Sequence, residues 1–342
     1  MRIALDAMGG DFAPAAVVKG AVLGARANPD VQIILVGDEA AVRGVPGADI
    51  SAVANITLLH APETIGMGEH PVSALRQKPN SSIAQAFRLV AGKKADAVVS
   101  AGNTGAMVAG AALSLKLLEG VKRPGIAITA ASPYGHCTVI DVGANVECRP
   151  LHLVQYAVMA TVYHRHVFNV ERPRLGLLSV GSEEHKGNKL TKDTFPLLKD
   201  LGGEFVGNVE GADIYEGKCD VVVCDGFVGN VMLKASEGLA ETMLAKMRES
   251  AEKDIWTRLG LKLLDPVVER MKKWLDFAEY GGAPLLGVDG ICIISHGRSD
   301  EAAIKNALGA AVRFSQYDVN GHIVGALAET RNIWTRAAEN TA

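Results

Sequence analysis

The chain has 342 residues, of which 48% are hydrophobic and 21% are charged, and its formal net charge at pH 7 is −3. This composition is typical of a folded globular protein and excludes an intrinsically disordered one. The small negative charge gives no general attraction to nucleic acid, so no nucleic-acid partner is expected. The five cysteines are scattered and lack the spacing of a zinc site, which fits a reducing cytoplasm. The chain opens directly on an apolar strand, so we expect no secretory signal.

Short apolar runs alternate with helix-like segments along most of the chain. The runs predict strands over residues 2–5, 32–36, 97–100, 126–130, 138–141, 175–180, 221–224 and 291–294. Between them, apolar spacing and capping residues predict helices over 11–27, 82–91, 106–118 and 151–166. Strands that alternate with helices form a mainly parallel sheet covered on both faces. We therefore expect an α/β fold, a three-layer sandwich.

Residues 235–282 break this alternation. They contain no predicted strand, and their apolar positions recur at helical spacing in a segment rich in Lys, Arg and Glu. Asp265 followed by Pro266 is typical of a helix start, which predicts a helical hairpin with arms over 254–263 and 266–279. The expected domains are an α/β catalytic domain over 1–235 and 283–342 and a helical hairpin insertion over 236–282.

Basic residues accompany the apolar positions of the expected hairpin, among them Lys262, Arg270, Lys272 and Lys273. A basic amphipathic segment suits a membrane surface or an acidic protein partner. Packing against the body of the protein or against a dimer mate would use the same pattern. The residues alone leave both interpretations open.

Clusters of Gly, Asn, Asp and Ser follow five of the apolar runs. In open α/β sheets ligands bind beyond the carboxyl ends of the strands, and a glycine-rich turn before a helix favours an anion. We therefore expect a small anionic substrate to contact these clusters, although a tight turn or a helix cap would use the same residue types. The expected substrate-binding residues in them are Asp6, Gly9, Gly10, Asp11, Gly102, Asn103, Thr104, Gly105, Asp141, Asn145, Asp225 and Gly226.

Three further residues are candidates for catalysis. Lys186 lies in a glycine-flanked loop after a strand, where a mobile positive charge suits phosphate, although a solvated loop charge has the same sequence pattern. Our hypothesis assigns Lys186 and Asn188 to binding phosphate or the oxyanion and Asn230 to orienting the substrate. Lys234 would point into the same cleft or toward solvent.

The loop that contains His70 and Lys78 is bounded by glycine and proline, and could form a movable wall of the site. Several familiar signatures are absent from the sequence: a P-loop, a GxGxxG after the first strand, a GxSxG elbow and a metal-ligand cluster. We therefore expect no metal and no cofactor. Because no Ser or Cys sits beside an evident base, we expect direct attack in a ternary complex and not an acyl-enzyme.

Together the motifs resemble those of the PlsX family, the acyl-acyl carrier protein:phosphate acyltransferases of bacterial phospholipid synthesis. The resemblance covers nearly the whole chain and is carried by residues 3–11 with Pro14, 102–106, 141–145, 184–188 and 225–230. It implies a fold related to the isocitrate dehydrogenase and phosphotransacetylase group. It also implies that a long-chain acyl group passes from acyl carrier protein to inorganic phosphate, giving acyl phosphate.

The resemblance has implications for partners as well. It implies a homodimer, a cytoplasmic location with peripheral contact to the inner face of the plasma membrane through the hairpin, and a downstream membrane glycerol-3-phosphate acyltransferase that uses the product. Ser179 departs from the family pattern, which favours Asn before the turn at Gly181. This departure puts one local contact in doubt and not the assignment.

Other classes of function stay open. A coenzyme A-dependent phosphotransacetylase would share the fold and the phosphate chemistry but use a short acyl-CoA donor. A non-catalytic scaffold on the membrane would need the hairpin but not the strand-end clusters. An NAD-dependent dehydrogenase is disfavoured by the missing dinucleotide fingerprint.

Overall fold

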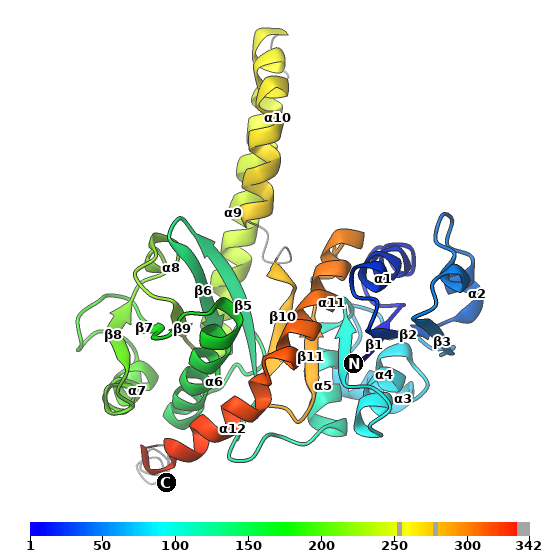
Figure 1. The fold of residues 1–342 in the computed structure, drawn as a ribbon. Helices are drawn as coiled ribbons and strands as arrows, with labels where there is room; N and C mark the ends of the chain where they lie inside the picture. Colours follow the sequence, from blue (N-terminus) through cyan, green and yellow to red (C-terminus); the bar gives the residue numbers. More distant parts are fainter. Residues whose placement is uncertain (252–254, 276–279, 334–342) are drawn as a thin grey trace.

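The computed structural model describes residues 1–251, 255–275 and 280–333, and within them the strands join into one eleven-stranded sheet (Figure 1). In chain order the strands are β1 (Arg2–Asp6), β2 (Gln32–Gly37), β3 (Ile56–His60), β4 (Ala97–Ser100), β5 (Gly125–Ser132), β6 (Gly135–Ile140), β7 (Arg174–Leu178), β8 (Glu204–Val209), β9 (Val221–Val223), β10 (Ala283–Leu286) and β11 (Ile291–Ile294). Their order across the sheet is β3-β2-β1-β4-β11-β10-β5-β6-β9-β7-β8.

The helices are α1 (Ala15–Ala27), α2 (Glu39–Arg43), α3 (Pro71–Gln77), α4 (Ser82–Ala91), α5 (Thr104–Ser114), α6 (Pro150–Phe168), α7 (Lys189–Asp200), α8 (Asp213–Glu216), α9 (Gly226–Ala251), α10 (Ile255–Leu275), α11 (Glu301–Gln316) and α12 (Val319–Glu329), with a short 3₁₀ turn at Ile50–Ala52. The helix predicted over 82–91 coincides with α4, and α1, α5 and α6 correspond to the other predictions with ends shifted by a few residues. Strands β3, β8 and β10 were not predicted. β3 and β8 lie at the two edges of the sheet, where partial burial leaves no continuous apolar run. β10 is central, but it is only four residues long and contains Pro284, which is uncommon in a central strand.

Helices cover both faces of the sheet. Successive strand residues point to opposite faces, so Ile3 and Leu5 of β1 join one core and Ala4 joins the other. Helices α1, α6, α7, α11 and α12 supply the first core. Helices α3, α4, α5 and the start of α9 pack on the second. This arrangement confirms the expected three-layer sandwich.

The sheet is mainly parallel, as expected, but its two halves run in opposite directions. Strands β3, β2, β1, β4 and β11 are parallel to one another, and so are β6, β9, β7 and β8. Between them β10 is antiparallel to both β11 and β5, and β5 is antiparallel to β6. The turn between β5 and β6 includes Gly135 at a φ of +139°, a backbone conformation that favours glycine. The two parallel sets therefore have their carboxyl ends on opposite sides of the sheet, measured along the strand direction.

Helices α9 and α10 project together from the sheet as a long hairpin (Figure 1). A helical hairpin in this part of the chain was expected, but the arms differ from those predicted. The first arm, α9, begins at Gly226, so the predicted domain boundary between residues 235 and 236 falls inside a helix. Residues Asp254 and Glu279, at the outer ends of the predicted arms, lie outside the described residues.

The turn predicted at Leu264-Asp265-Pro266 is wrong, because α10 continues through Pro266. The reason is visible in the spacing of apolar residues. Leu259, Leu263, Val267 and Met271 follow one another at four-residue intervals across the Asp-Pro pair, so a single helical stripe extends over both predicted arms. The helix continues through Asp265 and Pro266, although this pair is typical of a helix start, because the apolar stripe continues on both sides of it. No described helix is both long and apolar enough to cross a membrane.

His164 is a buried histidine of α6, and we expect it to make stability depend on pH. Its Nδ1 lies 2.9 Å from the Thr138 hydroxyl, and burial lowers its pKa to about 4. An unfolded histidine has a pKa of about 6.5, so the unfolded chain binds the extra proton first as the pH falls. Stability from this residue should therefore be present above pH 6.5 and be lost between about pH 6.5 and 4.

The expected loss between pH 7 and pH 5 is about 2 kcal/mol in the free energy of unfolding, measured by urea denaturation. His164→Gln should have a smaller decrease over this interval than the unmodified protein. His185→Gln, at an exposed loop position, serves as the control and should keep the full decrease. If the free energy of unfolding depends equally on pH in both variants, His164 is not a buried histidine that stays neutral in the folded protein.

Candidate active site

The loops that follow β1 and β4 meet through Asp6. The buried Asp6 carboxylate accepts a hydrogen bond from the Ser100 hydroxyl at 2.7 Å, and Ser100 Oγ in turn accepts one from the Gly102 N–H at 2.9 Å. Burial raises the pKa of Asp6 above its ordinary value, while the hydrogen bond from Ser100 acts in the opposite direction. Gly9 lies so close that a Cβ there would be 2.6 Å from the Gly102 nitrogen. Asp6 therefore fixes the shape of these loops.

The neighbouring residues form the outer part of the same loops. Gly10 adopts a φ of +104°, and the Asp11 N–H donates to the Gly297 carbonyl at 2.7 Å. Asn103 is the N-cap of α5, where its Oδ1 accepts from the Ala106 N–H at 3.0 Å. The first N–H groups of a helix lack intrahelical partners, so those of Thr104 and Gly105 can meet an anion.

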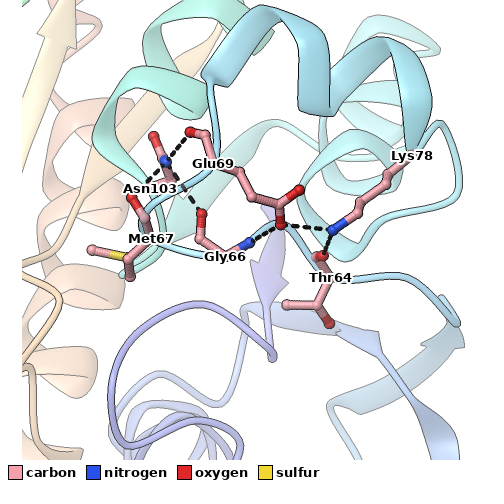
Figure 2. A network of polar contacts seen from close by, with 6 residues as sticks. All are labelled: Thr64, Gly66, Met67, Glu69, Lys78 and Asn103. Atoms are coloured by element: carbon pink, nitrogen blue, oxygen red, sulfur yellow. Dashed lines mark hydrogen bonds and ion pairs between the residues drawn. The ribbon is translucent and has the colours of Figure 1, made fainter.

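The loop expected to form a movable wall is held by hydrogen bonds (Figure 2). Lys78 Nζ donates to Glu69 Oε1 at 2.6 Å and to the Thr64 carbonyl at 2.9 Å. His70 lies at the N-cap of α3, and its Nδ1 is 3.4 Å from the Ser73 hydroxyl. The Lys78 ammonium is therefore engaged within the wall, and its expected contact with substrate stays a prediction.

At the opposite edge of the sheet, Asp141 organises the turn after β6. Its Oδ1 accepts hydrogen bonds from the N–H groups of Ile126, Gly143 and Ala144 at 2.9–3.1 Å, and its Oδ2 accepts one from Asn145 at 2.7 Å. The side chain is fully buried, and burial raises its pKa. The carboxylate is occupied by backbone of its own chain, so we interpret Asp141 as a residue that shapes the turn.

Asn145 and Asp225 are also engaged within the protein. The Asn145 amide donates to the Pro124 carbonyl at 2.6 Å and to the Tyr156 hydroxyl at 2.8 Å. Asp225 Oδ1 accepts from the N–H groups of Phe227 and Val228, both at 3.0 Å, at the start of α9. The Gly226 N–H donates to the Asn145 carbonyl at 2.9 Å, which joins the turn after β6 to the turn after β9.

Lys186 and Asn188 lie beyond β7. The Lys186 N–H closes a turn onto the Glu183 carbonyl at 3.0 Å, and the lysine side chain is exposed. Asn188 is the N-cap of α7, where its Oδ1 accepts from Thr191 N–H at 2.9 Å. A cavity of about 140 Å³, which we call the β7 cavity, is lined by Asn188, Ser179 and residues Asp225 and Val228 beside α9. The Ser179 hydroxyl, at the position that departs from the family pattern, is buried and has no hydrogen-bond partner among the described residues.

A second cavity, of about 120 Å³, joins the two halves of the sheet, and we call it the junction cavity. Thr104 lines it from the first set of strand ends, and Asn230 and Lys234 line it from α9. Its apolar lining is Ile126, Ile128, Val142, Leu233, Ala283 and Ile294. Val228 in the β7 cavity and Asn230 in the junction cavity lie two positions apart on α9, so the cavities flank the first turns of that helix.

One buried hydroxyl without a described partner belongs to a residue of the junction-cavity lining. Ser295 lines it and is 3% exposed, and its buried hydroxyl has no hydrogen-bond partner among the described residues. Asn230 is exposed in its mouth, whereas Lys234 is paired with Glu237 at 2.7 Å. Ser295 and His296 escaped the sequence analysis. Their position directly after the predicted strand over 291–294 is the signal that could have found them.

The structure thus brings together Thr104, Asn230 and Lys234, and separately Asn188 and Asp225. It places Lys186 in neither cavity lining. Among the described residues, no group of three or more His, Cys, Asp and Glu side chains could hold a metal ion. The chemistry around the junction cavity is therefore that of side-chain hydrogen-bonding groups and helix N–H groups beside an apolar lining, and the exposed Lys186 charge lies outside that lining.

Comparison with solved structures defines the class of fold. EutD phosphotransacetylase from Staphylococcus aureus aligns over 92% of this chain and 94% of its own, with a TM-score of 0.57 and 18% identity. A branched-chain phosphotransacylase from Enterococcus faecalis V583 aligns over 93% and 99%, with a TM-score of 0.54 and 14% identity. At such low identity the likeness establishes the fold alone. The chain is an α/β sandwich with the phosphotransacetylase fold.

Sequence comparison then identifies the family. The family model described as "Fatty acid synthesis protein" matches residues 1–322. A protein named phosphate acyltransferase from Brevibacillus brevis is 48% identical over 94% of this chain and 95% of its own length. One of the same name from Geotalea daltonii is 46% identical over 99% and 98%. The chain belongs to the fatty acid synthesis protein family.

Proposed function

We propose that the chain is an acyltransferase that moves a long-chain acyl group from acyl-acyl carrier protein to inorganic phosphate, giving acyl phosphate for phospholipid synthesis. The observation that carries the proposal is the junction cavity. It combines an apolar lining with the Ser295 hydroxyl, which has no described partner, and with the N-terminus of α5. The apolar lining suits the part of an acyl chain nearest the thioester, and the helix N–H groups suit a phosphate. The name of the relatives, phosphate acyltransferase, supports acyl transfer to phosphate.

In the proposed reaction a phosphate oxygen attacks the thioester carbonyl carbon. The C–O bond forms, the C–S bond breaks, and the carrier protein leaves as a thiolate. Phosphate is already a competent nucleophile and a thiolate a good leaving group, so the protein has to hold the reactants and stabilise the oxyanion. We assign Lys186 with Asn188 to phosphate or the oxyanion, the α5 N–H groups to completing the cradle, and Asn230 to orienting the thioester.

Direct attack is favoured over an acyl-enzyme because no cysteine near these loops is an activated nucleophile. Burial raises the pKa of the Cys224 thiol well above its usual value and that of Cys148 to about 11. Thiols of this kind stay protonated at neutral pH and react slowly. Steady-state kinetics should therefore have the pattern of a ternary complex.

The hairpin is the proposed contact for acyl carrier protein and the membrane surface. Its exposed apolar side chains are Leu239, Met243, Met247, Trp256, Leu259, Leu263, Leu264, Val267, Met271 and Trp274. An apolar surface of this extent, on a segment that also carries basic residues, suits a partner of mixed apolar and acidic character. A homodimer on the cytoplasmic side of the membrane would be compatible with it.

Reversing the charge of Lys272 and Lys273 to Glu should raise the KM for acyl carrier protein donor and weaken binding to anionic vesicles. The physical reason is that each basic residue near an anionic surface contributes about 1 kcal/mol to attraction. The matched control reverses two exposed lysines of the α/β sandwich, Lys94 and Lys305, and should change neither quantity. If both double variants behave as the unmodified protein does, the contacts lie elsewhere.

The assay for the proposed function mixes the protein with palmitoyl-acyl carrier protein and phosphate and traps acyl phosphate as its hydroxamate. Parallel reactions omit phosphate or replace the donor by palmitoyl-CoA or acetyl-CoA. Phosphate-dependent product from the carrier-protein donor is the expected result. Product only from a CoA donor would identify a phosphotransacetylase instead, and no product from any donor would leave a non-catalytic role.

A further inference from the structure

Asn103 connects the N-terminus of α5 to the wall formed by residues 64–78, and its side-chain N–H groups have no capacity left for substrate. Its Oδ1 caps α5 through the Ala106 N–H at 3.0 Å. Its Nδ2 donates to the carbonyls of Gly66, Met67 and Glu69 at 3.3, 3.0 and 3.1 Å (Figure 2). An Asn amide has two N–H donors, so three carbonyls use it fully. The residue is 7% exposed.

A second set of contacts fixes the same segment from its other side. Glu69 Oε1 accepts from the Gly66 N–H at 2.6 Å and from Lys78 Nζ at 2.6 Å (Figure 2). The Lys78 hydrogen bond holds the pKa of Glu69 below its usual value. Residues 66–69, which we call the clamped segment, are thus closed on themselves by Glu69 and joined to α5 by Asn103.

The clamped segment lies against the strand ends of the candidate site. Met67 is the apolar side chain that it presents: it is 48% exposed, and its methyl group lies 3.0 Å from the position a Cβ would take at Gly297. Gly297 follows β11 and bonds to Asp11 through its carbonyl at 2.7 Å. Gly297 adjoins His296, which lines the junction cavity, so Met67 lies beside that cavity and not in its lining. A flexible thioether adapts its shape to an apolar ligand chain.

We propose that Asn103 is a positioning residue, which holds the clamped segment as a fixed wall of the site and thereby places Met67 against the acyl part of the donor. Asn103 acts through the segment and does not itself touch substrate. The inference rests on the proposed function for its acyl donor, while the clamp itself is a property of the fold that is measured without any substrate.

The decisive variant is Asn103→Ser, because serine is as good an N-cap as asparagine but lacks the amide that binds the three carbonyls. Hydrogen exchange in peptides spanning 62–70 should rise about tenfold or more, while exchange within α5 stays as in the unmodified protein. The donor KM should rise more than kcat falls. Asn103→Ala removes cap and clamp together and should increase exchange in both regions.

A matched pair tests the outer contact. Glu69→Gln removes the ion pair to Lys78 and should raise exchange over 62–70 and the donor KM in the same direction as Asn103→Ser. Glu39→Gln removes the similar exposed ion pair to Arg43 on α2 and should change neither. If hydrogen exchange over 62–70 is unchanged in Asn103→Ser, Asn103 does not hold the clamped segment. If exchange increases but the donor KM does not change, the clamped segment is not a wall of the donor site.

A fall in kcat at constant KM, without faster exchange, would instead place Asn103 in contact with the reacting groups and would also overturn the proposal. If the unmodified protein forms no acyl phosphate, the proposed function fails by that assay alone. The exchange measurements would still decide whether Asn103 holds the segment, so the two failures are distinguishable.

Discussion

Lys186→Ala should lower kcat for acyl phosphate formation about 10²–10³-fold, equivalent to about 2.7–4 kcal/mol of barrier. Lys186 is exposed, and its Cγ lies 3.3 Å from the position that a Cβ would take at Gly181. Its backbone turn is held independently, because the Asn208 amide donates to the Glu183 carbonyl at 2.8 Å. Truncation therefore removes a positive charge and leaves the fold intact. The hydroxamate assay gives kcat and the phosphate KM, and thermal unfolding checks stability.

Lys192→Ala is the control, since Lys192 is an exposed lysine six residues further along the chain, on α7. It should retain full turnover. Lys186→Arg keeps the charge but changes its shape and should recover part of the rate. Full turnover by Lys186→Ala would remove the assigned role, and a trapped acyl-enzyme in any of these proteins would contradict direct attack in a ternary complex.

The sequence patterns predicted the layers of the fold well because the central strands are buried on both faces. Val221, Val222 and Val223 of β9 belong alternately to the two cores, and such a run has no polar position to obscure it. Helix α4 was predicted for a related reason, since Ile83, Phe87 and Val90 mark one apolar face. The spacing of apolar residues was sufficient to predict an element wherever its buried side chains recur at a regular interval.

The direction of the strands was beyond such reasoning. The β5–β6 hairpin reverses the direction of the strands in the second half of the sheet. An apolar run in the sequence does not indicate the direction of its strand within the sheet. The strand-end motifs consequently divide between two edges, with Asp6 and Asn103 at one and Asp141 and Asp225 at the other. The two sets approach each other where Thr104 and Asn230 line the junction cavity.

The roles of polar side chains were also underdetermined. Asn, Asp and Ser after a strand suit a ligand and a turn equally, because both use the same hydrogen-bonding groups. In the structure Asn103 and Asn188 cap helices, and Asp225 accepts hydrogen bonds from two N–H groups at the start of α9. Ser295 lines the junction cavity, and that its buried hydroxyl lacks a partner among the described residues is known only from the structure.

Asp141→Ala should destabilise the protein by about 3–5 kcal/mol, because it leaves several buried N–H groups without a hydrogen-bond acceptor. Four backbone N–H groups donate to this carboxylate at 2.7–3.1 Å inside the protein. An unsatisfied buried donor costs about 1–3 kcal/mol, and water that enters the vacated space recovers part of the total. The measurement is the free energy of unfolding in urea, compared with the kinetic constants of the fraction that remains folded.

Two further variants separate this role from binding of substrate. Asp141→Asn keeps an oxygen for the three N–H groups that meet Oδ1 and should lose less stability than Asp141→Ala. Asp225→Ala strands two N–H groups at a helix start and should cost about 1 kcal/mol. An Asp141→Ala protein with unchanged stability and a raised phosphate KM would mean that the carboxylate acts on substrate. If Asp141→Ala loses more stability than Asp225→Ala, the loss follows the number of N–H groups that each carboxylate satisfies, four and two.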